Sequence, residues 1–119
     1  MMIKSKPVFI DSYTNWCGVC KEMDSETFKD TLIINYINKH FYAVKFNGEK
    51  ANSFTVAGVT YHSPGRYHQY INFLGVNGFP TYSFLSENLN IINTAEGFYP
   101  PEKFITLLRN EIYFLNHHE

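Results

Sequence analysis

The sequence predicts a single mixed α/β domain, and three observations support this prediction. The chain has 119 residues, a usual length for one domain, and 45% of them are hydrophobic. A strand, a helical region and a second strand follow one another over residues 7–46, an order typical of a parallel crossover unit. Two further strands and an amphipathic helix complete the chain. We therefore expect residues 1–119 to form one domain.

The first strand and the first helix surround the two cysteines. Residues 7–13 are apolar and aromatic, which is typical of a buried strand, and residues 14–18 form a loop after it. Residues 19–28 suit a helix. The predicted strand therefore delivers Cys17 and Cys20 to the start of a helix.

A second helix and a second strand follow. Asp30 can cap a helix that ends near His40. Isoleucines at helical spacing give this helix one apolar face: Ile33, Ile34 and Ile37. Residues 41–46 are β-branched and aromatic and predict a strand, which Asn47 and Gly48 interrupt.

Residues 49–76 predict a short β-hairpin followed by a helix. Four residues flank Ala57-Gly58 in a hairpin pattern: Phe54, Val56, Val59 and Tyr61. Ser63-Pro64 can start a helix that reaches Leu74 and ends at Gly75. A dense aromatic and polar set in this region could form a surface that recognises a partner protein, or it could pack over the sheet: Tyr61, His62, Arg66, Tyr67, His68 and Tyr70.

The C-terminal part predicts an antiparallel strand pair and a helix. Residues 81–85 and 91–95 are the two strands, and Gly97 ends the second. Pro100-Pro101-Glu102 opens the helix. Its apolar residues stand at helical spacing: Phe104, Leu107, Leu108, Ile112 and Leu115.

Charge and hydropathy exclude several classes of partner. The formal net charge is -1 and no long basic run occurs, which argues against nucleic acid and anionic membranes as partners. No apolar stretch reaches the roughly 18 residues of a membrane-spanning helix. The start of the chain lacks the apolar segment of a signal peptide, so both an intracellular protein and a mature exported domain fit the sequence.

The two cysteines predict redox chemistry. Cys17 and Cys20 can close a small disulfide ring at a helix N-terminus, where unpaired N–H groups and partial positive charge stabilise a thiolate. Cys17, at the helix start, is the expected nucleophile, and Cys20 is expected to resolve the mixed disulfide.

The same cysteine spacing also supplies half of a zinc site. Such a site needs two more ligands, and the histidines of the chain show no compact ligand spacing: His40, His62, His68, His117 and His118. We therefore expect no metal and no cofactor besides the redox-active cysteines.

The chain resembles the thioredoxin family in three motifs. Trp16-Cys17-Gly18-Val19-Cys20 is similar to the family's active-site sequence, and Asp11 stands six positions before the first cysteine, as the family's buried aspartate does. Gly78-Phe79-Pro80-Thr81 is similar to the family's cis-proline loop. The resemblance implies a central mixed β-sheet flanked by helices, here with a hairpin-like insertion at about residues 48–62.

The resemblance also implies roles for individual residues. Asp11 would accept a proton as the resolving cysteine attacks, or it is a satisfied polar group at the end of a strand. Lys45 matches the family's lysine that faces this aspartate and would tune its pKa, unless it faces solvent. Pro80 is expected to be cis, and with Trp16 and Phe79 to contact the substrate. Trp16 could instead pack in the core.

A narrower likeness concerns the bacterial cell envelope. Cys20-Lys21-Glu22-Met23 is similar to the thiol-reducing domains of envelope disulfide-interchange proteins, which favours the periplasm over the cytoplasm. Gly18-Val19 stands where the common thioredoxin has Gly-Pro, and these residues help to set the cysteine pKa. The direction of the redox reaction is therefore open.

We expect a thiol–disulfide oxidoreductase that reduces protein disulfides. Its partners would be disulfide-containing proteins and a redox donor protein, and a monomer is the default for a domain that offers its active face to other proteins. The alternatives are a disulfide oxidase or isomerase, or a binding module that keeps the fold as a scaffold.

Overall fold

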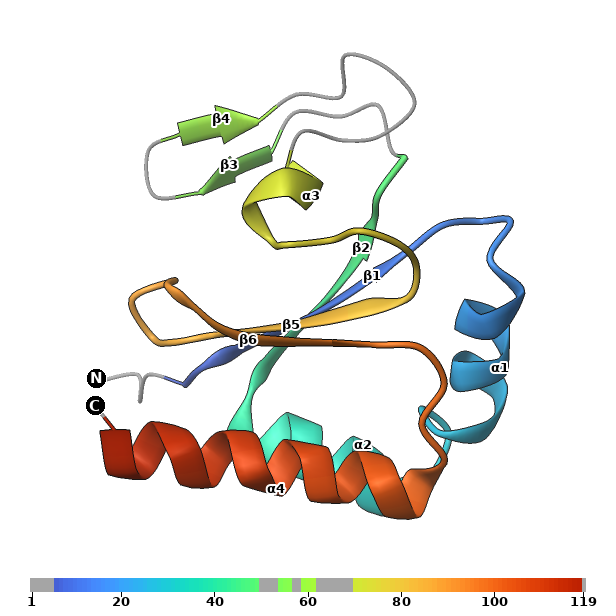
Figure 1. Ribbon diagram of the computed structural model, residues 1–119. Helices are drawn as coiled ribbons and strands as arrows, with labels where there is room; N and C mark the ends of the chain where they lie inside the picture. The colour runs from blue at the N-terminus through green and yellow to red at the C-terminus, as the bar shows by residue number, and fades with distance from the viewer. Residues whose placement is uncertain (1–5, 50–53, 57–58, 62–69, 119) are drawn as a thin grey trace.

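The computed structural model describes residues 6–49, 54–56, 59–61 and 70–118 (Figure 1). Four strands form the main sheet, in the order β2-β1-β5-β6. Their bounds are Val8–Tyr13 for β1, Tyr42–Asn47 for β2, Thr81–Leu85 for β5 and Ile91–Glu96 for β6. β1 is parallel to β2 and antiparallel to β5, and β6 is antiparallel to β5. The sheet is therefore mixed, as the sequence predicted.

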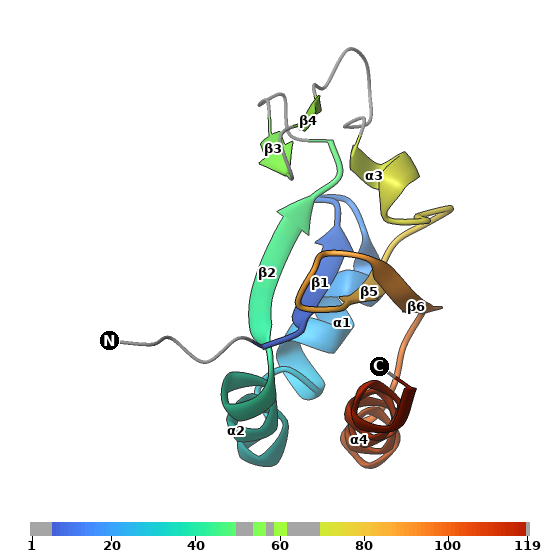
Figure 2. The same ribbon diagram turned by 90° about the vertical axis from the view of Figure 1, so that its left-hand side faces the viewer.

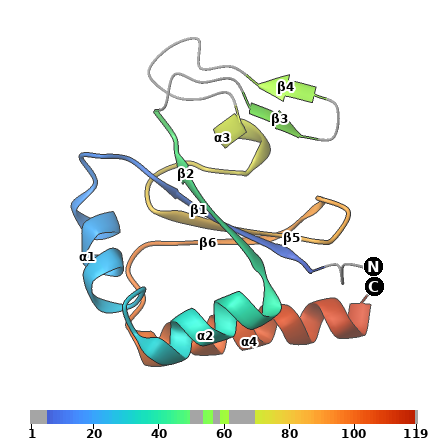
Figure 3. The same cartoon turned by 180° about the vertical axis from the view of Figure 1, so that it is seen from behind.

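Three helices pack toward one face of this sheet. They are α1 (Gly18–Glu26), α2 (Thr31–His40) and α4 (Pro101–His118). α2 and α4 lie side by side beneath the strands, as the end-on and rear views show (Figures 2 and 3). α2 starts where predicted, because Asp30 Oδ1 accepts hydrogen bonds from the N–H groups of Leu32 at 2.9 Å and Ile33 at 3.3 Å.

Alternation along the strands builds a separate core on each face of the sheet. Phe9 of β1 points to the helices and belongs to a large aromatic core. We call this side the aromatic face, and its buried residues are Phe9, Met23, Ile33, Ile37, Phe41, Tyr82, Phe84, Phe104, Ile105 and Leu108. Ile10 points to the other side, where a smaller core joins Ile10, Phe46, Leu74, Val76 and Leu85.

The predicted hairpin is confirmed. β3 (Phe54–Val56) pairs antiparallel with β4 (Val59–Tyr61), beyond the end of β2 (Figure 1). Of the helix predicted from residue 63, the structure describes α3 at Tyr70–Phe73, and residues 62–69 lie outside the described part. The side chains of the predicted recognition surface lie outside it as well.

Three sequence predictions need correction. Ile34 is 39% exposed, because Ile33 and Ile37 already fill the contact with the core, so its place on the apolar face was wrong. The first helix ends at Glu26, and Phe28 follows it as a half-buried side chain that packs on the aromatic core. Phe41 is not a strand residue but the C-cap of α2, buried before β2 begins.

None of the described helices is long and apolar enough to cross a membrane.

Candidate active site

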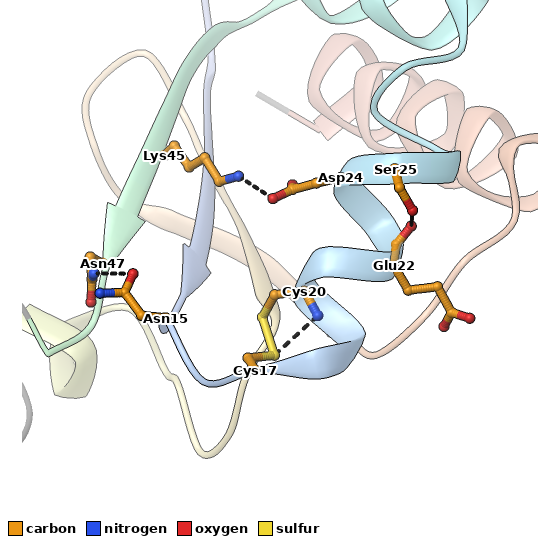
Figure 4. A network of polar contacts seen from close by, with 8 residues as sticks. All are labelled: Asn15, Cys17, Cys20, Glu22, Asp24, Ser25, Lys45 and Asn47. Atoms are coloured by element: carbon orange, nitrogen blue, oxygen red, sulfur yellow. Dashed lines mark hydrogen bonds and ion pairs between the residues drawn. A yellow bond between two sulfur atoms is a disulfide. The ribbon is translucent and has the colours of Figure 1, made fainter.

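The two cysteines form a disulfide at the N-terminus of α1 (Figure 4). Their Cα atoms are 5.3 Å apart. Cys17 is the N-cap residue, and the backbone N–H of Cys20 donates to Cys17 Sγ at 3.1 Å. Both residues are buried. An N–H group directed at this sulfur, together with the helix dipole, would stabilise a Cys17 thiolate in the reduced protein.

Two hydrogen bonds hold the segment before the disulfide, one within its own loop and one to β2. The Cys17 N–H donates to Thr14 O at 3.4 Å. Asn15 Oδ1 accepts a hydrogen bond of 3.2 Å from Asn47 Nδ2, at the end of β2 (Figure 4). The loop that carries the nucleophile is thus attached to the neighbouring strand.

Asp11 lies in β1 on the aromatic face. It is 7% exposed and is the Cα partner of Lys45 on β2 and of Tyr82 on β5. Burial raises the pKa of the Asp11 carboxyl from its ordinary value of 3.8 to about 7, while Lys45 lowers this pKa and Asp24 raises it. The carboxyl can therefore gain or lose a proton near neutral pH.

Lys45 takes a position that the resemblance describes only in part. It stands beside Asp11 in the strand register, but its Nζ lies 2.6 Å from Asp24 Oδ2 on α1. Nζ also lies 4.8 Å from the centre of the Tyr13 ring. Within the described part of the chain, Lys45 forms its ion pair with Asp24 and none with Asp11.

Trp16 and the Phe79–Pro80 loop lie together. The register pairs Ser12 with Thr81, so the chain before Thr81 runs beside the chain that leads to Cys17. The Phe79–Pro80 peptide bond is cis, as the sequence analysis expected. The ring centroids of Trp16 and Phe79 are 6.2 Å apart in an edge-to-face contact.

Trp16 is a surface residue rather than a core residue. It is 55% exposed, which rules out the alternative of core packing. Its Nε1 donates to Glu49 Oε1 at 2.9 Å. Beside it lies a hollow of about 410 Å³, lined by Trp16, Ile71, Val76, Asn77, Gly78 and Phe79. We call this side of the sheet the hollow face.

Sequence reasoning missed three residues of this region. Asp24 pairs with Lys45, and Glu49 holds the Trp16 indole. At Gly48, an added Cβ would lie 2.6 Å from the Phe79 ring, so this position needs a residue without a side chain. The sequence predicted a strand break at Asn47-Gly48, but no signal in the neighbouring residues indicated the contact between Gly48 and Phe79.

This fold and the disulfide at the start of α1 define a class of proteins that exchange thiols and disulfides. The chain belongs to the thioredoxin-like domain family, whose model matches residues 2–112. Family, fold and disulfide together indicate a thiol–disulfide oxidoreductase.

Solved structures show the same fold. A thioredoxin from Thermus thermophilus superposes with a TM-score of 0.69 at 17% identity, over 96% of this chain and 84% of that one. The oxidised DsbD C-terminal domain of Neisseria meningitidis gives 0.63 at 21% identity, over 89% and 80%. The DsbH oxidoreductase gives 0.68 at 13% identity, over 96% and 75%. No curated protein sequence matches the chain.

Proposed function

We propose that this protein reduces disulfide bonds in other proteins with the dithiol of Cys17 and Cys20. The observation that carries the proposal is the disulfide that caps α1, with the Cys20 N–H 3.1 Å from Cys17 Sγ. A sulfur in this position is stabilised as a thiolate, which is the form that attacks disulfides. The similar DsbD domain of Neisseria meningitidis is solved in an oxidised and a reduced form.

The first step joins the enzyme to its substrate. The Cys17 thiolate attacks one sulfur of the substrate disulfide, a mixed disulfide forms, and the other substrate sulfur leaves as a thiolate. In the second step Cys20 attacks Cys17 Sγ. The second substrate thiolate leaves, and the Cys17–Cys20 disulfide forms. Two electrons thus pass from the protein dithiol to the substrate disulfide.

Asp11 is proposed to take the proton of the Cys20 thiol in the second step. A free thiol has a pKa of about 8.5, and the pKa of Asp11 is raised to about 7 by burial. Because the two values are close, the carboxylate is a suitable base near neutral pH.

The hollow beside Trp16 is proposed to hold the substrate chain. Its lining by Trp16, Ile71, Val76 and Phe79 fits apolar side chains of an extended segment, and the cis-proline loop offers backbone groups next to it. A dithiol donor protein must then reduce Cys17–Cys20 for the next cycle, so two classes of protein partner are expected.

Trapping the mixed disulfide tests this proposal. Reduced Cys20→Ser is mixed with an unfolded protein that contains one disulfide, and adducts are identified by mass spectrometry without reductant. We expect an adduct on Cys17, because the resolving thiol is missing. The matched Cys17→Ser variant should give none. Equal adducts in both variants, or none in either, would contradict the proposal.

A further inference from the structure

One lysine, Lys45, interacts with two carboxylates, Asp11 and Asp24. Lys45 on β2 is the Cα partner of Asp11 on β1, so both side chains leave the sheet on the aromatic face. Lys45 Nζ nevertheless ends 2.6 Å from Asp24 Oδ2 on α1 (Figure 4). Asp24 therefore holds the ammonium group that the strand register brings next to Asp11.

The position of Asp24 on α1 is related to that of the second cysteine. Cys20 and Asp24 are four residues apart in one helix, so they lie on the same side of it. The side chains of Lys45 and Asp24 are 47% and 40% exposed, whereas Asp11 is buried. An exposed carboxylate keeps its charge at lower cost than a buried one, so Asp24 competes successfully for Lys45.

The charged and titratable groups around Asp11 come from three elements. β2 contributes Lys45, α1 contributes Asp24, and β5 contributes Tyr82. Burial is the largest influence on the pKa of Asp11, followed by Lys45, which lowers it, and Asp24, which raises it. Burial raises the pKa of Tyr82, and the charge of Asp11 raises it further, so this hydroxyl stays neutral.

We infer that Asp24 is a positioning residue for proton transfer at Asp11. By pairing with Lys45, it limits the influence of the ammonium group on Asp11, so that the buried carboxylate can accept a proton. This inference rests on the proposed function, because it assigns that proton to the Cys20 thiol. The carboxylate receives the proton as Cys20 attacks the mixed disulfide and later releases it to water.

Removing either charge of the pair should then have opposite effects. In D24N, Lys45 can turn to Asp11, which lowers the pKa of Asp11 and makes it a weaker base. In K45M, no ammonium group acts on Asp11, and its pKa rises. The pair is exposed and screened by salt, so we expect each change to be about 0.3 to 0.7 of a pH unit.

The test is an NMR titration of the Asp11 carboxyl carbon in the oxidised protein, where the cysteines do not titrate. It compares the wild type, D24N, K45M and the double variant. The Asp11 midpoint should fall in D24N and rise in K45M. The fall caused by D24N should be smaller in the K45M background than in the wild type. E22Q is the matched control, because it removes an acid that lies on the same helix and points away from the sheet (Figure 4). The Asp11 midpoint should not move in E22Q.

Two results of the titration would overturn the inference. One is an unchanged midpoint in a D24N variant that is shown to be folded by chemical unfolding. The other is an equal fall in both backgrounds, because Asp24 would then act by direct repulsion and not through Lys45.

A second readout separates this inference from the proposed function. Release of a small thiol from a mixed disulfide at Cys17 reports the attack by Cys20. The pH midpoint of the release rate should shift between variants in the same direction as the Asp11 titration midpoint. If no variant releases the thiol, the proposed function is wrong, while the effect of Asp24 on Asp11 is upheld by the titration. If the thiol is released but the pH midpoint of its release is unchanged in D24N, the positioning role of Asp24 is wrong.

Discussion

The two faces of the sheet differ in packing and in chemical character. On the aromatic face, the Phe9 ring packs against Phe28, Phe41, Tyr82, Phe84 and Phe104, with centroids 5.5 to 6.2 Å apart. On the hollow face, a smaller core leaves an open hollow of about 410 Å³ next to Trp16. The disulfide lies at the N-terminus of α1, after the loop that follows β1.

This difference separates two requirements of disulfide exchange. Dense packing on the aromatic face removes water from Asp11 and raises its pKa to about 7. Open space on the hollow face exposes apolar side chains that a substrate can cover. The proposed function places proton transfer on the packed side and substrate recognition on the open side, and substitutions can test each side separately.

The largest expected effect is the loss of an aromatic ring from the dense core. Phe9→Ala should lower the free energy of unfolding by about 3 to 5 kcal/mol, because it removes ring contacts and leaves a cavity. Ile10→Ala, at the next position on the other face, should cost about 2 to 3 kcal/mol. Chemical unfolding of the oxidised variants measures both. A larger cost for Ile10→Ala would contradict the assigned difference in packing.

The next effect depends on pH and concerns the buried acid. The pKa of Asp11 is raised to about 7 in the folded protein, so the folded state binds this proton more tightly than the unfolded state does. The proton on Asp11 therefore stabilises the folded state fully below about pH 4, and this contribution is lost as the pH rises to about 7. At about 1.4 kcal/mol for each pKa unit, the loss in free energy of unfolding is at most about 4 kcal/mol.

Asp11→Asn removes this titration. Its unfolding free energy should be close to that of the wild type at about pH 4 and should exceed it by a few kcal/mol at about pH 8. Denaturant unfolding over this pH range measures the difference. A gap that does not change with pH would show that Asp11 titrates alike in the folded and unfolded states.

A smaller effect is expected at Gly48, which lies against the Phe79 ring that lines the hollow. Gly48→Ala would bring a Cβ to 2.6 Å from the half-buried Phe79 ring, which must move. We expect a cost of about 1 to 2 kcal/mol, and altered Trp16 fluorescence because Trp16 contacts that ring. Gly78→Ala is the matched control, since no atom lies within 4 Å of its added Cβ. Identical fluorescence in Gly48→Ala and wild type would show that Phe79 does not connect Gly48 to Trp16.

The smallest effect concerns the hydrogen bond on Trp16. Glu49→Ala removes the acceptor of the 2.9 Å bond from Trp16 Nε1. Because Trp16 is exposed, stability should fall by less than about 1 kcal/mol. The KM for a protein substrate should rise, with little change in kcat, if the bond fixes the indole beside the hollow. A drop in kcat alone would instead connect Glu49 to the chemical step.

Much of the fold was predictable because its signals are local. The aromatic run of β1, the cap at Asp30 and the proline start of α4 each depend on neighbouring residues, and these elements formed as predicted. The disulfide was predictable for the same reason, since its two cysteines are three positions apart.

The missed features depend on contacts between distant segments. Asp24 meets Lys45 across a sequence separation of 21 residues, and the Trp16 bond to Glu49 spans 33. Ile34 fits the helical spacing of Ile33 and Ile37, but the width of the contact between α2 and the core decides which isoleucines are buried. Such choices follow from packing, which periodicity alone does not contain.

The most direct test of the account is the redox equilibrium of Cys17 and Cys20. The protein is equilibrated with glutathione or dithiothreitol buffers, and free thiols are quantified at each potential. We predict a reversible two-electron couple near thioredoxin's value of about -270 mV, whereas a value near about -120 mV would indicate an oxidant. A pair that shows no reversible couple would contradict the claim that this site exchanges disulfides.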